Sequence, residues 1–210
     1  MEYKVGKFSK LLEEKNRLSE IDGQNSSLQS NSDYVWRDLK AEFVVKNTSG
    51  GNNPTFGEWR PGMEGLLFSG SNMNQVWVDF HIDHDYAVGT RLYPHVHWLP
   101  LTNVAGVVRW GIQYSIAKGH GQGLFDTITT VYMNHEIGIN NQYRHYVTET
   151  TDQFSILSDK VEPDSVIKMR VFREGAIDSH NGVIHAWQAD LHYQVARIET
   201  VNKAPNFFVK

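Results

Sequence analysis

The spacing of hydrophobic residues differs between the N-terminal segment and the rest of the chain. Over residues 8–21 the apolar positions follow a period near 3.6 residues, which places them on one stripe: Phe8, Leu11, Leu12, Leu18 and Ile21. This spacing predicts a short amphipathic helix. Ser9 near its start and Gly23 just beyond its end are residue types that begin and terminate helices.

Residues 22–33 are polar apart from one large apolar side chain, Leu28. Such a segment buries too little apolar surface to offset the entropy lost on ordering, so we predict a linker. The chain then divides into an N-terminal arm, residues 1–33, and a domain, residues 34–210. Because a helix this short is marginal in water, its stripe needs a surface, either on its own domain or on a neighbouring subunit.

Beyond Asp33 the pattern changes to short runs of aromatic and β-branched residues separated by Gly, Asn, Asp and Pro. This pattern predicts nine strands within the following runs: Val35–Val45, Gly65–Ser69, Val76–Ile82, Thr90–Leu99, Val107–Ala117, Thr127–Asn134, Tyr143–Ile156, Val166–Arg173 and Val183–Ile198. Two further segments, residues 47–54 and 118–123, are rich in turn formers and are predicted to be surface loops.

Alternation within these runs indicates sheets with one buried face. In residues 166–173, Ile167, Met169 and Val171 alternate with Lys168, Arg170 and Phe172, of which Phe172 is the one apolar exception. In the last run, one face carries Trp187, Ala189, Leu191, Tyr193 and Val195, and the other carries Gln188, Asp190, His192 and Gln194. Half-buried alternation is typical of antiparallel sheets, so we predict an all-β, two-sheet antiparallel sandwich of the jelly-roll type with a short helical arm.

Composition narrows the range of partners. The 210 residues contain 20 Lys and Arg against 24 Asp and Glu, a net charge of −4, which lacks the cationic excess that nucleic-acid binding requires. No apolar run approaches the roughly 20 residues needed to span a bilayer, and the first residues carry no apolar leader. We therefore expect no nucleic-acid or membrane partner. Cysteine is absent, which excludes disulfides and thiolate ligands.

Ten histidines make a metal site the first chemistry to consider. The segment Gly89–His97 resembles the opening of the cupin motif, in which a glycine precedes a His-x-His pair, and in a strand His95 and His97 would share one face. The glutamate expected three or four residues later is missing, because Pro100 and Leu101 stand there and Thr102 follows. His95 and His97 are therefore weak metal candidates, with a hydrogen-bonded histidine pair or a structural metal as the alternatives, and we expect no cofactor.

A second polar group falls between residues 79 and 85. Asp79, His81 and Asp83 would share one strand face, which suits either a hard cation, a tuned base or a solvated surface. We favour the solvated surface. Nucleophile elbows, phosphate-binding loops and dinucleotide fingerprints do not occur, so we assign no catalytic residues and expect a protein that is not an enzyme.

The six tryptophans divide by context. Trp77, Trp110 and Trp187 lie inside alternating runs and are predicted to be core residues. Trp59 follows Pro54 and Gly57 in a predicted loop, where an exposed ring would mark a contact surface for a partner or a sugar.

Four segments resemble a family of small virion structural proteins of tailed phages: residues 34–38, 80–98, 109–114 and 186–193. The likeness covers about residues 34–198 and leaves the arm outside. It implies a jelly-roll domain of the viral coat type and carries over no catalytic site.

The resemblance implies a structural role in the virion, and we keep other functions as alternatives to it. We expect a capsid decoration or cement protein that stabilises the head, assembles as a homotrimer in the host cytoplasm and contacts the major capsid protein. Its candidate subunit or capsid contacts are Phe8, Leu11, Leu12, Leu18, Ile21 and Trp59. A tail, connector or fibre-base component is the first alternative. A cupin-like metal-binding protein using His95 and His97, and a carbohydrate-binding sandwich using Trp59, are the others.

Overall fold

A computed structural model describes residues 34–45, 52–196 and 200–208 of the chain. The chain divides into two units, residues 1–35 and 36–210. The predicted helix and linker, and with them the candidate contacts Phe8, Leu11, Leu12, Leu18 and Ile21, lie outside the described residues. In the ranges that the structure describes, no helix is long and apolar enough to cross a bilayer.

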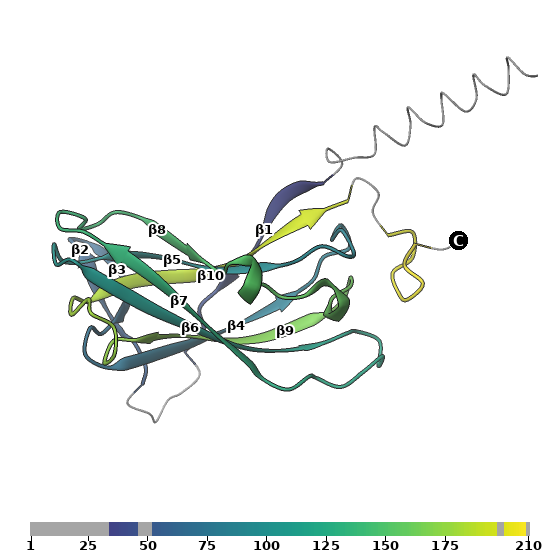
Figure 1. Ribbon diagram of the computed structural model, residues 1–210, viewed down its shortest axis with the longest axis horizontal. Coiled ribbons are helices and arrows are strands. Elements are labelled where there is room, and N and C mark those ends of the chain that lie inside the picture. The colour runs from purple at the N-terminus through teal and green to yellow at the C-terminus, as the bar shows by residue number, and fades with distance from the viewer. Residues whose placement is uncertain (1–33, 46–51, 197–199, 209–210) are drawn as a thin grey trace, which may run out of the picture. The chain divides into compact units, whose positions relative to one another are not determined.

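The regular secondary structure of the described chain is almost entirely β-strand, joined by loops (Figure 1). Two short 3-10 turns, η1 and η2, are its helical segments. The elements run in this order: β1 (Val35–Glu42), β2 (Thr55–Arg60), β3 (Met63–Phe68), β4 (Met73–His81), β5 (Tyr93–Pro100), β6 (Gly106–Ala117), β7 (Thr129–Ile137), β8 (Tyr146–Glu149), η1 (Asp152–Phe154), η2 (Ser158–Lys160), β9 (Val166–Glu174) and β10 (Ile184–Val195).

The last eight strands pair in the nested order of a jelly roll. Strand β3 pairs with β10, β4 with β9, β5 with β8 and β6 with β7, all antiparallel. Rolling this ribbon up produces two sheets, β3-β10-β5-β8 and β4-β9-β6-β7. Strand β2 extends the first sheet beyond β3, and β1 adds to it along β10, which makes it six-stranded. The predicted two-sheet antiparallel jelly roll is therefore the observed fold.

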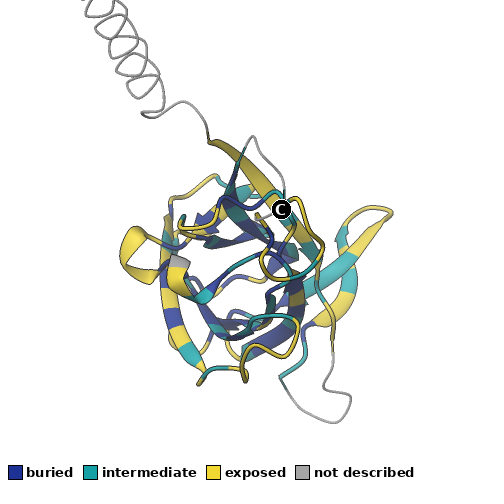
Figure 2. Cartoon of the chain, turned by 90° about the vertical axis from the view of Figure 1, so that its right-hand side faces the viewer, coloured by how far each residue is buried: buried dark blue, intermediate teal, exposed yellow. Residues whose placement is uncertain are grey.

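The hydrophobic core lies between the two sheets. Inward side chains of β5 and β6 place Trp98 and Trp110 edge to face at 6.4 Å, both fully buried. In β9, Ile167, Met169 and Val171 face this core, as their alternation predicts. Buried residues accordingly line the interior of both sheets in Figure 2, while exposed residues lie on the loops and on strands such as β1 and β2.

Each of the nine predicted runs contains or overlaps a strand, whereas β2 was not predicted. Strand β2 follows Pro54 and contains Gly57, so its sequence is typical of a turn, yet it pairs with β3 over Thr55–Arg60. The prediction that Trp59 stands in a loop is therefore wrong. Its ring is half-buried on a strand.

Trp110 is a core residue as predicted, but Trp77 and Trp187 are not. Trp77 is half-buried and lines a hollow on the outer face of the four-stranded sheet. At Trp187 a β-bulge shifts the pairing of β10 with β5 between Ala186 and Gln188. The extra residue puts two consecutive side chains, Trp187 and Gln188, beside the same outer groove, which strict alternation cannot anticipate.

Candidate functional site

Polar side chains gather on the outer face of the six-stranded sheet, where β5 and β10 pair. His95 lies opposite Asp190, His97 opposite Gln188 and Tyr93 opposite His192. Residues between them, such as Val96 and Ala189, belong to the core. The outward positions of two strands about 90 residues apart in sequence therefore form one cluster.

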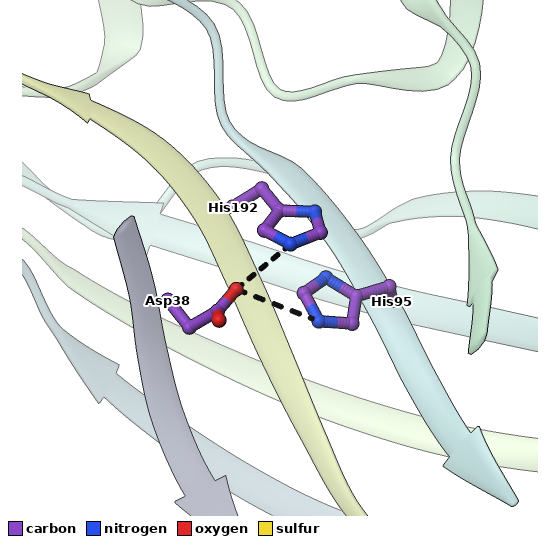
Figure 3. Close-up of side chains that lie close together, drawn as sticks. All are labelled: Asp38, His95 and His192. Carbon is purple, nitrogen blue, oxygen red and sulfur yellow. Dashed lines mark ion pairs between the residues drawn. The ribbon is translucent and has the colours of Figure 1, made fainter. Parts of the chain in front are cut away.

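Strand β1 adds a carboxylate to this cluster. Figure 3 shows Asp38 directed from β1 toward His192 on β10 and His95 on β5. Asp38 Oδ1 lies 2.8 Å from His192 Nε2 and 3.9 Å from His95 Nε2. His192 also contacts the carboxylate of Glu149 through Nδ1, and its ring stacks on that of His95 with centroids 4.0 Å apart.

The inner part of the cluster is buried. His95 and Asp190 are each 1% exposed. Asp190 Oδ2 accepts a hydrogen bond from Gln188 Nε2 at 2.9 Å and lies 3.2 Å from His97 Nε2 and 3.9 Å from His95 Nε2. The 3.2 Å contact is an ion pair, and neither His97 Nε2 nor Asp190 Oδ1 has a hydrogen-bond partner in the strict geometric sense among the described residues.

Burial and neighbouring charges decide the protonation of this cluster. Burial lowers the pKa of His95, and the imidazole of His192 lowers it further. Burial alone would raise the pKa of Asp190, but the nearby His97 and His95 outweigh it and hold that pKa below its usual value. At neutral pH the cluster thus contains a neutral imidazole, His95, facing an ionised carboxylate, Asp190.

An aromatic groove of about 520 Å³ lies on the same face, toward β2 and β3. Trp59 stacks on His185 with centroids 5.1 Å apart and planes 11° from parallel, and Trp187 lies 5.4 Å from the same imidazole. The remaining lining includes Phe56 and Met63 on the apolar side and Glu42, Glu64 and Gln188 on the polar side. We call this surface the tryptophan groove.

A smaller hollow of about 390 Å³ adjoins the histidine cluster at the other end. Its walls are the rings of Trp36 and Tyr93, which pack edge to face at 5.6 Å, and the side chains of Glu149, Asp152 and His192. This hollow gives solvent and small solutes access to the cluster.

The predicted set at residues 79–85 is not brought together as a site. Asp79 pairs with Lys168 on the neighbouring strand at 2.8 Å. His81 instead approaches Asp164, which His84 and His120 also contact at 3.0 and 2.7 Å. Three histidines therefore surround one carboxylate at a loop edge of the sandwich, a cluster that sequence spacing did not suggest.

The structure brings the predicted pair His95 and His97 onto one face, with ring centroids 5.0 Å apart. It also supplies the carboxylates that local sequence lacked. Asp190 comes from the paired strand and Asp38 from an added strand. The polar alternation of residues 188–194 was the one available signal for Asp190, since it already placed that residue on the outer face.

Neither a protein-family model nor a curated protein matches the chain. Among solved structures, one chain of infectious bursal disease virus, Gx strain, is similar over 81% of this chain at 12% identity and a TM-score of 0.37. This chain spans 33% of that viral chain.

Carbohydrate-binding modules are also similar. TmCBM27, which recognises mannan, matches 77% of this chain and 96% of its own at 13% identity and a TM-score of 0.32. A family 22 module of Clostridium thermocellum Xyn10B matches 82% and 92%, at 12% identity and a TM-score of 0.29. Likeness this distant assigns no function, so the functional argument rests on the side chains.

Proposed function

We propose that the protein is a non-enzymatic structural protein of a tailed-phage virion that decorates the head and stabilises the shell through subunit contacts. The observation that carries the proposal is where the resembling segments lie. Residues 93–98 and 186–193 lie in β5 and β10, and residues 35–38 form the first half of β1, which pairs with β10. Three of the four segments that resemble phage virion proteins thus build one outer face.

The tryptophan groove on that face is the proposed contact surface for the major capsid protein. Half-buried tryptophans beside a hollow are the side chains that most often dominate binding energy between proteins, because a large ring excludes much water at little entropic cost. Trp59 and Trp187 hold these positions, and Glu42 and Glu64 supply a polar rim. The proposed assembly is a homotrimer, with the N-terminal arm adding contacts to the shell or to neighbouring subunits.

Particles made without the gene test this proposal directly. We expect them to lose surface density in electron micrographs and to rupture more readily on heating or osmotic shock, and the purified protein to restore both properties. Trp59→Ala and Trp187→Ala should weaken rebinding at least about tenfold. Trp77→Ala, which removes a half-buried ring from the opposite sheet, is the matched control. An unchanged shell without the gene would refute the proposal, and antibody labelling at the tail would favour the tail or connector alternative.

A second candidate function is carbohydrate binding, favoured by the same groove. An aromatic platform beside a few polar side chains suits the flat apolar faces and hydroxyls of sugar rings. The near-parallel stack of Trp59 on His185 presents such a platform. A glycan array probed with the full chain and with Trp59→Ala separates the two functions. Binding lost in the variant favours a sugar ligand, and silence of the array argues against one.

A further inference from the structure

Three potential metal ligands meet on the outer face of the six-stranded sheet. They are His95, His97 and Asp190, each of which offers one ligand atom, and these atoms all lie within 4.8 Å of one another. The individual separations from Asp190 Oδ2 are 3.2 Å to His97 and 3.9 Å to His95. Adjacent strands hold all three, so their spacing is set by the sheet.

Hydrogen bonds on the far side of the imidazoles direct the lone pairs toward this centre. His95 Nδ1 lies 3.3 Å from the carbonyl oxygen of Tyr93, which can only accept, so the proton of a neutral His95 is on Nδ1 and its lone pair is on Nε2. His97 Nδ1 pairs with His145 Nε2 at 2.9 Å, a hydrogen bond in which either ring can be the donor. In the tautomer in which His97 Nδ1 donates, the lone pair of His97 is on Nε2 and can coordinate.

The polar atoms at the centre are not satisfied by the protein itself. His97 Nε2 and Asp190 Oδ1 are buried without a hydrogen-bond partner among the described residues. Asp190 is 1% exposed, so water does not compensate its charge freely. A buried carboxylate oxygen and imidazole lone pairs that face one another repel, and a cation between them turns the repulsion into attraction.

We infer that His95, His97 and Asp190 bind one divalent transition-metal ion. Imidazole nitrogen and carboxylate oxygen are the donors such ions take, and two donors about 2.0–2.1 Å from a tetrahedral ion lie about 3.3 Å apart. The observed 3.2 and 3.9 Å reach this geometry with small side-chain movements. Magnesium and calcium are disfavoured because they prefer an all-oxygen set.

Asp38 belongs to a second such group, with His95 and His192, and this group shares His95 with the first. Its Oδ1 atom lies 3.9 Å from the same Nε2 atom of His95, and His192 holds it from the other side at 2.8 Å. An ion that also takes Asp38 would cross-link β1, β5 and β10, and would face the hollow lined by Trp36 and Tyr93. This metal site does not depend on the proposed virion function.

Zinc binding to the full chain tests the inference. After treatment with EDTA and dialysis, we expect calorimetry and elemental analysis to find one tight Zn²⁺ per chain, and the melting temperature to rise with zinc. Asp190→Asn and His97→Gln, which keep side-chain volume, should each weaken binding at least about tenfold. Asp38→Asn should weaken it less. Cobalt in place of zinc should show the visible absorption of a low-symmetry site in the native chain and lose it in both strong variants.

The second histidine cluster provides the matched control. Asp164→Asn removes a carboxylate that three histidines contact, at a distance from β5, and should leave tight zinc binding unchanged. Near-ultraviolet circular dichroism without metal checks that each variant folds. If Asp190→Asn does not fold, zinc binding is tested with His97→Gln alone. Two results would overturn the inference. One is the absence of tight zinc binding to the native chain. The other is tight binding that Asp164→Asn abolishes and that Asp190→Asn and His97→Gln both preserve.

Discussion

Arg173 and Asp178 form a fully buried, two-point ion pair at the end of β9. Arg173 Nε and one terminal nitrogen donate to the two carboxylate oxygens at 2.8 and 3.2 Å, and both side chains are 0% exposed. The guanidinium also donates to the carbonyl oxygens of Phe68, His180 and Gly182. One buried cation thus links β9 to the end of β3 and to the loop that precedes β10.

Replacing Arg173 by Met should therefore destabilise the domain strongly. The change leaves the Asp178 carboxylate buried without its partner and removes hydrogen bonds from three carbonyl groups, which together cost about 3–5 kcal/mol in the free energy of unfolding. Urea unfolding measures this loss. Lys168→Met, at the exposed pair with Asp79, is the control and should cost about 1 kcal/mol or less. Equal effects of the two changes would contradict the role given to burial.

Gly65→Ala should disturb the tryptophan groove. A Cβ atom at Gly65 would lie 2.2 Å from Cε1 of His185, so the imidazole that supports Trp59 has to move. We expect a loss of about 1–3 kcal/mol in the free energy of unfolding, together with weaker binding of any ligand of the groove. Gly123→Ala, which meets no atom within 4 Å, should change stability by no more than about 0.5 kcal/mol. Unfolding curves of the two variants distinguish these outcomes.

Acid should destabilise the domain below pH 6.5. Burial lowers the pKa of four largely buried histidines from 6.5: His95, His135, His180 and His185. Below pH 6.5 the unfolded chain therefore binds more protons than the folded one, and the free energy of unfolding falls with pH until the folded imidazoles protonate. Each excess proton contributes a slope of about 1.4 kcal/mol per pH unit.

One of these histidines can be removed to test the assignment. His135 Nδ1 forms a hydrogen bond with the hydroxyl of Thr148 at 3.1 Å, and that hydroxyl also accepts from Trp98 Nε1. His135→Leu should therefore reduce the slope of unfolding free energy against pH below 6.5, measured by urea titration in EDTA. If the slope of the unfolding free energy against pH is the same in the variant and the native chain, His135 has the same pKa in the folded and unfolded chains, and the assignment is wrong.

The contact between Tyr193 and Asp85 should make the stability of the domain depend on pH above pH 10. Burial, aided by the hydrogen bond that Tyr193 donates to Asp85 at 3.0 Å, raises the pKa of Tyr193 from 10.0 to about 12. Between these values the unfolded tyrosine ionises and the folded one does not, so its contribution to stability is lost as pH rises from 10 to 12. Tyr193→Phe should flatten this part of the stability profile. An ultraviolet titration in which the native chain shows no late-ionising tyrosine would contradict the assignment.

The sequence by itself determined nine of the ten strand segments, all but β2, and the buried face of strands such as β9. Alternation is a local property, because successive side chains of a strand point to opposite faces whatever strand lies alongside. It therefore predicted the core face of β9, the polar face of β10 with Asp190, and the shared face of His95 and His97. A two-sheet antiparallel sandwich followed as an architecture that buries one face of each strand.

Only the tertiary structure decided which outward residues meet. Pairing partners and register depend on contacts between residues far apart in the chain, and no local pattern records that Asp190 lies opposite His95 or that Asp38 reaches the same imidazole. A single bulge likewise moved Trp187 from the predicted core to the groove beside Trp59. The candidate site is a product of these long-range pairings, because its residues come from three strands that the sequence keeps apart.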